Sequence, residues 1–192
     1  MNKDHQKIVQ FLFEMGTMRK LPRIHRQPLL TDDKSDNIAT HSYRVTLIGW
    51  FLAKLEKADP YKVVMMCLSH DMAEVRAGDH NWIHKRYVKI FEEEIREEQL
   101  GTLPFKDLEN LAVEYDKRAS KEAVVAKDAD MLDQIFLLRE YIWQGNKEAQ
   151  LWLEKADIMD RFKTDNAKKL AKIIMKEQPS SWMEKLVTSK NR

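Results

Sequence analysis

Helix-breaking residues are scarce in this chain. Five glycines and five prolines are spread over 192 residues, and no segment alternates polar and apolar residues for long enough to predict a β-sheet. Apolar residues recur instead at intervals of three and four, the spacing of one face of an α-helix. We therefore expect an all-α fold, a compact bundle of several helices. A chain of this length suits a single domain over residues 1–192.

Charge and cysteine content narrow the classes of function. Lysine and arginine total 33 against 31 for aspartate and glutamate, so the net charge of +2 offers no basic surface for polymeric nucleic acid. The single cysteine, Cys67, excludes an internal disulfide, and its apolar surroundings indicate a buried thiol in a reducing compartment. The first residues lack the apolar stretch of a signal peptide, and no apolar run is long enough to span a membrane. A soluble, cytoplasmic protein that makes no contact with membranes is expected.

Capping and turn residues divide the first part of the chain. The pattern predicts an amphipathic helix over residues 3–18 and a basic, proline-containing connector over residues 19–37. Asn37 is expected to cap the second helix, and Asp59-Pro60 to begin the third.

One histidine stands at the head of an apolar face in the second helix. His41 precedes Val45, Ile48, Leu52 and Leu55 at positions i, i+4, i+7, i+11 and i+14, so its imidazole is expected to turn inward. A lone histidine in such a stripe is more often a satisfied core residue than a metal ligand. Only further ligands elsewhere in the chain favour the second interpretation.

The stretch L-S-H-D-M-A-E supplies such ligands. His70 and Asp71 end an apolar run, and His70 and Glu74 share the inward face of the third helix with Val63 and Cys67. Buried ionisable groups at this density are costly unless they bind something or one another, so a metal site and a salt-bridge cluster are the two interpretations. Adjacent helical residues point about 100° apart, so other segments must complete a metal shell.

Residues 120–143 predict the central helix, because apolar residues occupy nearly its whole circumference. Asp128, Asp130 and Asp133 stand out there. Asp128 and Asp130 lie about 200° apart and cannot face one site, whereas Asp130 and Asp133 lie about 60° apart. Periodicity alone does not choose between them.

The helices predicted after Gly145-Asn146 carry no visible chemistry. We expect residues 146–192 to serve packing or dimerisation, with their methionines and tryptophans as packing residues.

Two basic stretches flank the candidate ligands. The connector over residues 19–37 is either a solvated loop or part of a site. After Gly78-Asp79, basic and aromatic residues mix as in a rim that could hold a base and a phosphate, although an ordinary exposed turn would look the same. The mixed residues are His80, Trp82, His84, Lys85, Arg86, Tyr87 and Lys89.

The candidates together are His41, His70, Asp71 and one aspartate of the central helix. Two imidazoles and two carboxylates suit a divalent cation such as Mn, Co, Fe, Ni, Zn or Mg, and a shell without thiolates does not indicate structural zinc. Such a shell also leaves positions for water and a phosphate oxygen.

This order of ligands in a helical chain resembles the HD-domain metal-dependent phosphohydrolases, over about residues 19–141. The resemblance is greatest to the 5'-deoxynucleotidase branch, whose motifs match in order. They are H-R-Q-P-L-L at 25–30, A-T-H-S-Y-R-V at 39–45, S-H-D-M-A-E-V-R-A-G-D at 69–79 and V-A-K-D-A-D-M-L at 125–132.

The resemblance implies a fold, a metal shell and roles for individual residues. It implies an HD-domain bundle with the metal between central helices, a homodimer, and Asp130 as the last ligand. It also implies that Glu74 is catalytic beside the attacking water, that Arg26 binds phosphate or the sugar edge, and that Asp79 orients the substrate. Only His80 and His84 lie between the His-Asp pair and the last aspartate, and both come early, so a single metal ion is expected.

The predicted reaction is hydrolysis of (deoxy)nucleoside 5'-monophosphates, with Asp71 and Glu74 as catalytic residues and Lys85 helping Arg26 to offset phosphate charge. Gln27, Thr40 and the segment H-N-W-I depart from the bacterial motifs and leave base and sugar selectivity open. The alternatives are a deoxynucleoside triphosphate triphosphohydrolase, a cyclic-nucleotide phosphodiesterase, or a non-catalytic helical scaffold.

Overall fold

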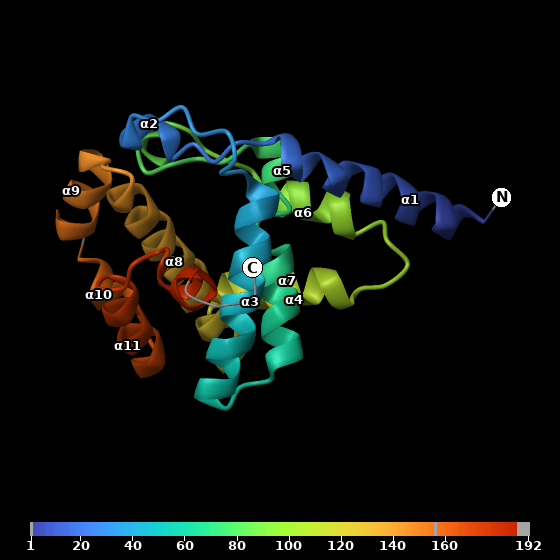
Figure 1. The fold of residues 1–192 in the computed structure, drawn as a ribbon. Coiled ribbons are helices and arrows are strands. Elements are labelled where there is room, and N and C mark those ends of the chain that lie inside the picture. The colour runs from blue at the N-terminus through green and yellow to red at the C-terminus, as the bar shows by residue number, and fades with distance from the viewer. Residues whose placement is uncertain (1, 156, 188–192) are drawn as a thin grey trace.

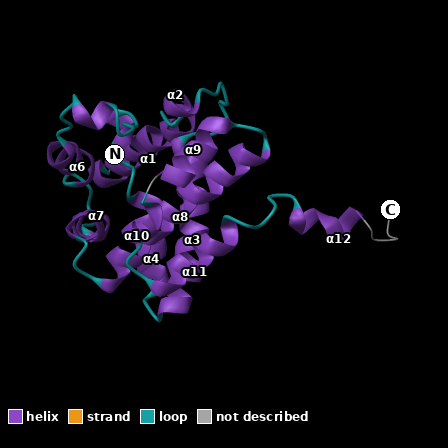
Figure 2. Ribbon diagram, turned by 90° about the vertical axis from the view of Figure 1, so that its left-hand side faces the viewer, coloured by secondary structure: helices purple, strands orange, loops and turns teal. Residues whose placement is uncertain are grey.

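The computed structural model describes residues 2–155 and 157–187, and helices dominate this part of the chain (Figure 1; Figure 2). No β-strand occurs in it beyond an isolated bridge between Pro22 and Asn37. The predicted all-α fold is therefore confirmed. The elements are α1 (Lys3–Met15), η1 (Gly16–Lys20), α2 (Arg26–Leu29), α3 (Ile38–Glu56), α4 (Pro60–Ser69), α5 (Glu74–Ala77), η2 (His84–Arg86), α6 (Glu92–Leu100), α7 (Asp107–Lys117), α8 (Lys121–Trp143), α9 (Lys147–Lys155), α10 (Ile158–Arg161), α11 (Asp165–Ile174), η3 (Ser181–Met183) and α12 (Glu184–Val187).

Side-chain caps start the three central helices. The Asn37 side chain accepts the backbone N–H of Thr40 at 3.0 Å, and the Thr40 hydroxyl accepts the Asn37 N–H in return, which closes a reciprocal cap on α3. Asp59 caps α4 ahead of Pro60, and Ser120 caps α8. Both predicted caps, Asn37 and Asp59, are confirmed.

The third helix differs from its prediction, because α4 ends at Ser69 and Glu74 begins the separate short helix α5. The His70 ring donates from Nδ1 to the carbonyl oxygen of Cys67 at 2.8 Å, so the side chain engages the last turn of the backbone. The chain continues through turns closed by hydrogen bonds between residues i and i+3, such as the one from the Glu74 N–H to the Asp71 carbonyl. His70 thus caps α4, and Asp71 follows in the turn.

Helix α8 is the centre of the bundle. It packs against α3, α4, α7, α9 and α11, and side chains such as Val125, Leu132 and Leu138 are fully buried. Figure 1 shows α3 and α4 running side by side across α8, while α9, α10 and α11 gather on one flank. Within the described residues no helix is both long and apolar enough to cross a lipid bilayer.

A glycine permits the close approach of α3 and α4. A Cβ atom added to Gly49 would lie 2.6 Å from Cys67 Sγ and 3.1 Å from Val63 Cγ1, both of which are buried side chains of α4. The first distance is far below a normal van der Waals contact, so any larger residue would push the helices apart. Gly49 therefore fixes the distance between α3, which carries His41, and α4, which is capped by His70.

We predict that Gly49→Ala lowers the free energy of unfolding by about 1–2 kcal/mol, because the steric overlap outweighs the roughly 1 kcal/mol that alanine gains in a helix. Cys67→Ala removes the closest clashing atom, so the double variant should be more stable than the sum of the single effects allows. Denaturant unfolding of all four proteins measures this coupling. Strictly additive changes would show that the Gly49–Cys67 approach does not limit the packing.

Candidate metal centre and the cavity around it

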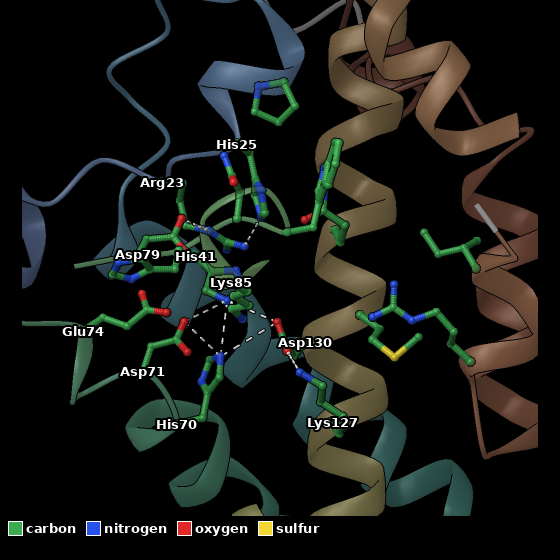
Figure 3. A pocket seen from close by; sticks show the side chains of 18 of the residues that line it. Arg23, His25, His41, His70, Asp71, Glu74, Asp79, Lys85, Lys127 and Asp130 are labelled. Atoms are coloured by element: carbon green, nitrogen blue, oxygen red, sulfur yellow. Dashed lines mark hydrogen bonds and ion pairs between the residues drawn. The ribbon is translucent and has the colours of Figure 1, made fainter. Parts of the chain in front are cut away.

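Three central helices bring four predicted ligands together. His41 lies in the second turn of α3, His70 and Asp71 follow the last turn of α4, and Asp130 lies in the middle of α8. The packing of α3 and α4 on α8 closes the gap of some ninety positions between the first and last of them. Figure 3 shows their side chains converging, with the two carboxylates flanking the imidazole pair.

The donor atoms are spaced as a small cation requires. The distances are 3.3 Å from His41 Nε2 to His70 Nε2, 3.3 Å from His41 Nε2 to Asp71 Oδ2 and 3.2 Å from His70 Nε2 to Asp71 Oδ2. The centre of such a triangle lies about 1.9 Å from each corner, so an ion slightly out of the plane would reach about 2.0–2.2 Å from all three donors. Asp130 Oδ1 lies 3.4 Å from His41 Nε2 and 3.8 Å from His70 Nε2 and can supply a fourth donor.

Both imidazoles are oriented by hydrogen bonds at their far nitrogens. His41 Nδ1 donates to Asp133 Oδ2 at 2.6 Å, and His70 Nδ1 donates to the Cys67 carbonyl at 2.8 Å. With the proton held on Nδ1, each Nε2 lone pair is directed toward the other donors. This arrangement is typical of histidines that bind a metal ion.

The three aspartates of α8 have different partners in the structure. Asp130 faces the other ligands, and Asp133 holds His41 and also accepts the Nε–H of Arg44. Asp128 is buried and accepts the N–H groups of Lys163 and Thr164 and the Thr164 hydroxyl, so it fastens the start of α11 to α8. Only Asp130 lies within reach of a shared cation.

The electrostatics of the site call for a positive charge. Burial and the charge of Arg23 act to lower the pKa of His41, but its hydrogen bonds to Asp130, Asp133 and Asp71 raise that pKa well above the ordinary value. Burial acts to raise the pKa of Asp71, yet the nearby His70 and His41 hold it well below its usual range. Carboxylates that stay ionised while buried fit a divalent cation, so the donor set agrees with the predicted metal.

Glu74 borders this donor set without touching a partner. Its Oε2 atom is buried and forms no hydrogen bond to any described residue. Burial raises the pKa of Glu74 to about 9, and the neighbouring charges of Asp71 and Asp79 add to the rise. Figure 3 shows the side chain lying beside Asp71 in the same cavity.

A cavity of about 910 Å³ opens above the donors. Its volume falls within the range of small-molecule sites. Several cationic side chains line it, among them Arg23, Lys85, Arg118 and Lys127. Lys127 Nζ pairs with Asp130 Oδ2 at 2.7 Å, and the Arg118 guanidinium stacks 3.8 Å above the ring of Tyr115, next to His70.

The predicted substrate-binding residues are distributed unevenly. Asp79 and Lys85 line the cavity, and Asp79 accepts the backbone N–H of Ile24 at 2.6 Å. Arg26 lies in α2 with a buried Nε, and it does not line the cavity. Its role in substrate binding stays a prediction.

Sequence reasoning missed Arg23, which takes a place in the cavity from the same connector. Its side chain is buried, with Nε 3.7 Å from Asp79 Oδ2 and Nη1 3.9 Å from Asp133 Oδ2. Nothing in the local sequence distinguishes it from the other basic residues of the connector, because the carboxylates that it pairs with, Asp79 and Asp133, lie more than fifty residues away.

Trp152 of α9 was expected to serve packing alone. It does pack against the core, and it also lines the cavity.

Comparison with known proteins places the chain in a family. The model of the HD domain family matches residues 18–174. The bovine protein named 5'-deoxynucleotidase HDDC2 is 28% identical over 160 residues, which cover 76% of this chain and 73% of that protein.

Solved structures share the fold. A structural-genomics crystal structure matches with a TM-score of 0.75 at 27% identity, covering 92% of this chain and 99% of that one. A Magnetospirillum magnetotacticum protein described as a predicted metal-dependent phosphohydrolase matches with a TM-score of 0.70 at 22% identity, over 90% of this chain and 91% of that one. The family model covers more than half of the chain, and the chain therefore belongs to the HD domain family, as its motifs predict.

Proposed function

We propose that this protein is a 5'-nucleotidase that releases phosphate from (deoxy)nucleoside 5'-monophosphates with the help of one divalent cation. The observation that carries the proposal is the convergence of His41, His70, Asp71 and Asp130 at one side of a cavity lined by cations. The name of the bovine relative, a 5'-deoxynucleotidase, supports the substrate class.

Phosphate binding is assigned to cationic side chains near the donors. Arg23 is positioned by Asp79 and His25, and its Nη1 atom is buried without a hydrogen bond to the described residues. A guanidinium in this state favours an anionic oxygen as its partner. Lys85 is placed across the same cavity and would add a second positive charge (Figure 3).

A bound divalent cation would supply Lewis acidity, which acidifies water and polarises a phosphoryl oxygen. Glu74 is the group placed to move the proton of the attacking water. Its pKa of about 9 depends in part on the negative charge of Asp71, so a cation that compensates this charge would lower the pKa of Glu74 and favour the ionised carboxylate. A carboxylate with a raised pKa can accept the proton of the attacking water and return it to the departing 5'-oxygen.

Asp79 and the buried imidazoles contribute by positioning. Asp79 holds Arg23 and the backbone of Ile24, so it orients the phosphate-binding guanidinium as well as any sugar hydroxyl that reaches it. His41 and His70 keep their proton on Nδ1 and leave Nε2 free to bind the cation.

We also infer a cytoplasmic homodimer. Cys67 is a buried free thiol, as suits a reducing compartment. The outer face of α3 exposes Tyr43, Leu47 and Phe51 at four-residue spacing, a stripe that a second copy could cover.

We predict that Asp71→Asn and Asp130→Asn each lose bound metal and phosphatase activity together, because a neutral amide cannot replace an ionised ligand. Metal affinity should fall by more than the roughly 10–100-fold that loss of an orienting partner costs. Metal content per chain and phosphate release from deoxynucleoside 5'-monophosphates measure both.

The matched control for this pair is Asp128→Asn on the same helix. It should keep its metal content and lose thermal stability, since Asp128 only fastens α11. Full activity in thoroughly metal-stripped wild-type protein would refute the assignment.

We predict that Glu74→Gln keeps its metal but lowers kcat by about 10²–10⁴-fold, the usual effect of removing a general acid–base group. The isosteric amide preserves shape and removes the titrating proton. Steady-state kinetics beside metal analysis separate the two roles. Loss of metal in this variant would instead make Glu74 a ligand.

A further inference from the structure

The cavity extends beyond the space that a cation and a phosphate occupy. Along α8, the residues that line it are Lys127, Asp130, Met131 and Gln134, at i, i+3, i+4 and i+7. Gln134 therefore lies one turn beyond Asp130 on the same face of the helix, a rise of about 6 Å. This end of the cavity is available to the part of a substrate that is not the phosphate.

The walls at this end combine aromatic and apolar side chains with charged ones, among them Glu148, Lys155 and Arg161. The apolar and aromatic contacts come from Leu151 and Trp152 of α9, from His25 at the start of α2 and from Pro28 within α2. α2 packs against α9, and the rings of His25 and Trp152 meet edge to face, with centroids 5.4 Å apart and planes at 81°. Aromatic rings held in this way offer a rigid contact surface for a flat ligand.

Two polar groups on these walls lack partners. The amide Nε2 of Gln134 is buried and makes no hydrogen bond within the described ranges. His25 accepts a hydrogen bond at Nε2 from Arg23 Nη2 at 2.8 Å, and because a guanidinium can only donate, the His25 proton must lie on Nδ1. Nδ1 is buried as well, with no acceptor nearby in the part of the chain that the structure covers.

His25 is held neutral at physiological pH. Burial lowers its pKa to about 4, and the adjacent charge of Arg23 acts in the same direction. The imidazole therefore presents a fixed N–H donor, while the Gln134 amide can donate and accept. A buried donor without a partner is costly in the empty site and becomes favourable once a ligand supplies the acceptor.

We propose that Trp152, Gln134 and His25 form the nucleobase subsite, with the Trp152 side chain against the base face and Gln134 and His25 Nδ1 bonded to its edge. This proposal rests on the proposed nucleotidase function and names the part of the site that reads the base. A sugar phosphate without a base would leave both polar groups unpaired, so the subsite favours nucleotides over other phosphomonoesters.

The test compares substrates with and without a base. Gln134→Leu and Trp152→Leu are assayed on the four deoxynucleoside 5'-monophosphates and on 2-deoxyribose 5-phosphate. We expect kcat/KM to fall about 10-fold or more for the preferred nucleotide, mainly through KM, because base stacking and edge contacts are lost. Turnover of 2-deoxyribose 5-phosphate should change by less than about twofold, as expected for a substrate that never uses the subsite.

Two controls keep the outcome unambiguous. Gln150→Leu changes an exposed residue of α9 that does not line the cavity and donates a hydrogen bond to Glu154, so it should leave the turnover of both substrates unaffected. Trp152 also packs on the core, whereas Gln134 is outside it, so Gln134→Leu decides the question if Trp152→Leu does not fold.

Calorimetry with nucleosides provides a readout that needs no turnover. Metal-stripped wild-type protein should bind the nucleoside of the preferred nucleotide, and Gln134→Leu should bind it at least about 10-fold more weakly. Equal losses on nucleotide and sugar phosphate, or unchanged nucleoside binding, would overturn the subsite. If the wild type hydrolyses no phosphomonoester, the proposed function fails, and nucleoside binding still judges the subsite separately.

Discussion

The crowding of carboxylates around two buried imidazoles is the interaction on which the site depends. Asp71, Asp130 and Asp133 all lie within 3.4 Å of a nitrogen of His41, whose side chain is 1% exposed. Buried negative charge at this density is unfavourable unless a cation balances it. A proton on His41 neutralises part of this negative charge, and a divalent ion would neutralise more of it. The arrangement is therefore best understood as a metal site whose cost in folding is offset on binding.

Three neighbouring aspartates of the central helix α8 have different roles in building the site. Asp128, Asp130 and Asp133 are five positions apart at most, yet Asp128 fastens α11, Asp130 faces the candidate metal site and Asp133 orients His41. The helical turn separates their directions enough for three tasks. Close packing completes the site, because the absence of a side chain at Gly49 lets α3 and α4 approach each other at this spacing.

The sequence predicted what is local and missed what depends on distant partners. The capping chemistry of Asn37 and Asp59 predicted where α3 and α4 begin. The apolar face of α3 predicted that His41 turns inward. Asp130 needed the family motif, since periodicity left Asp133 equally open. The apolar run predicted a helix end near His70 and Asp71, but the separation of Glu74 into its own short helix α5 was missed, although the bond from His70 to the Cys67 carbonyl is local. Arg23 and Trp152 were missed because only the fold brings them to the cavity.

The cavity is chemically polarised, and this polarity indicates the kind of molecule that fits. One end holds ionised carboxylates, the Arg23 guanidinium and Glu74, and the other holds Trp152 with polar atoms that await a partner. An inorganic anion would use only the first end, and an apolar ligand only the second. His25 joins the two, because its bond from Arg23 both steadies the proposed phosphate-binding group and fixes the donor at the far end. A phosphate attached through a sugar to a flat, hydrogen-bonding ring would use both ends at once, and for this reason we propose a nucleotide, rather than either part alone, as the ligand of this cavity.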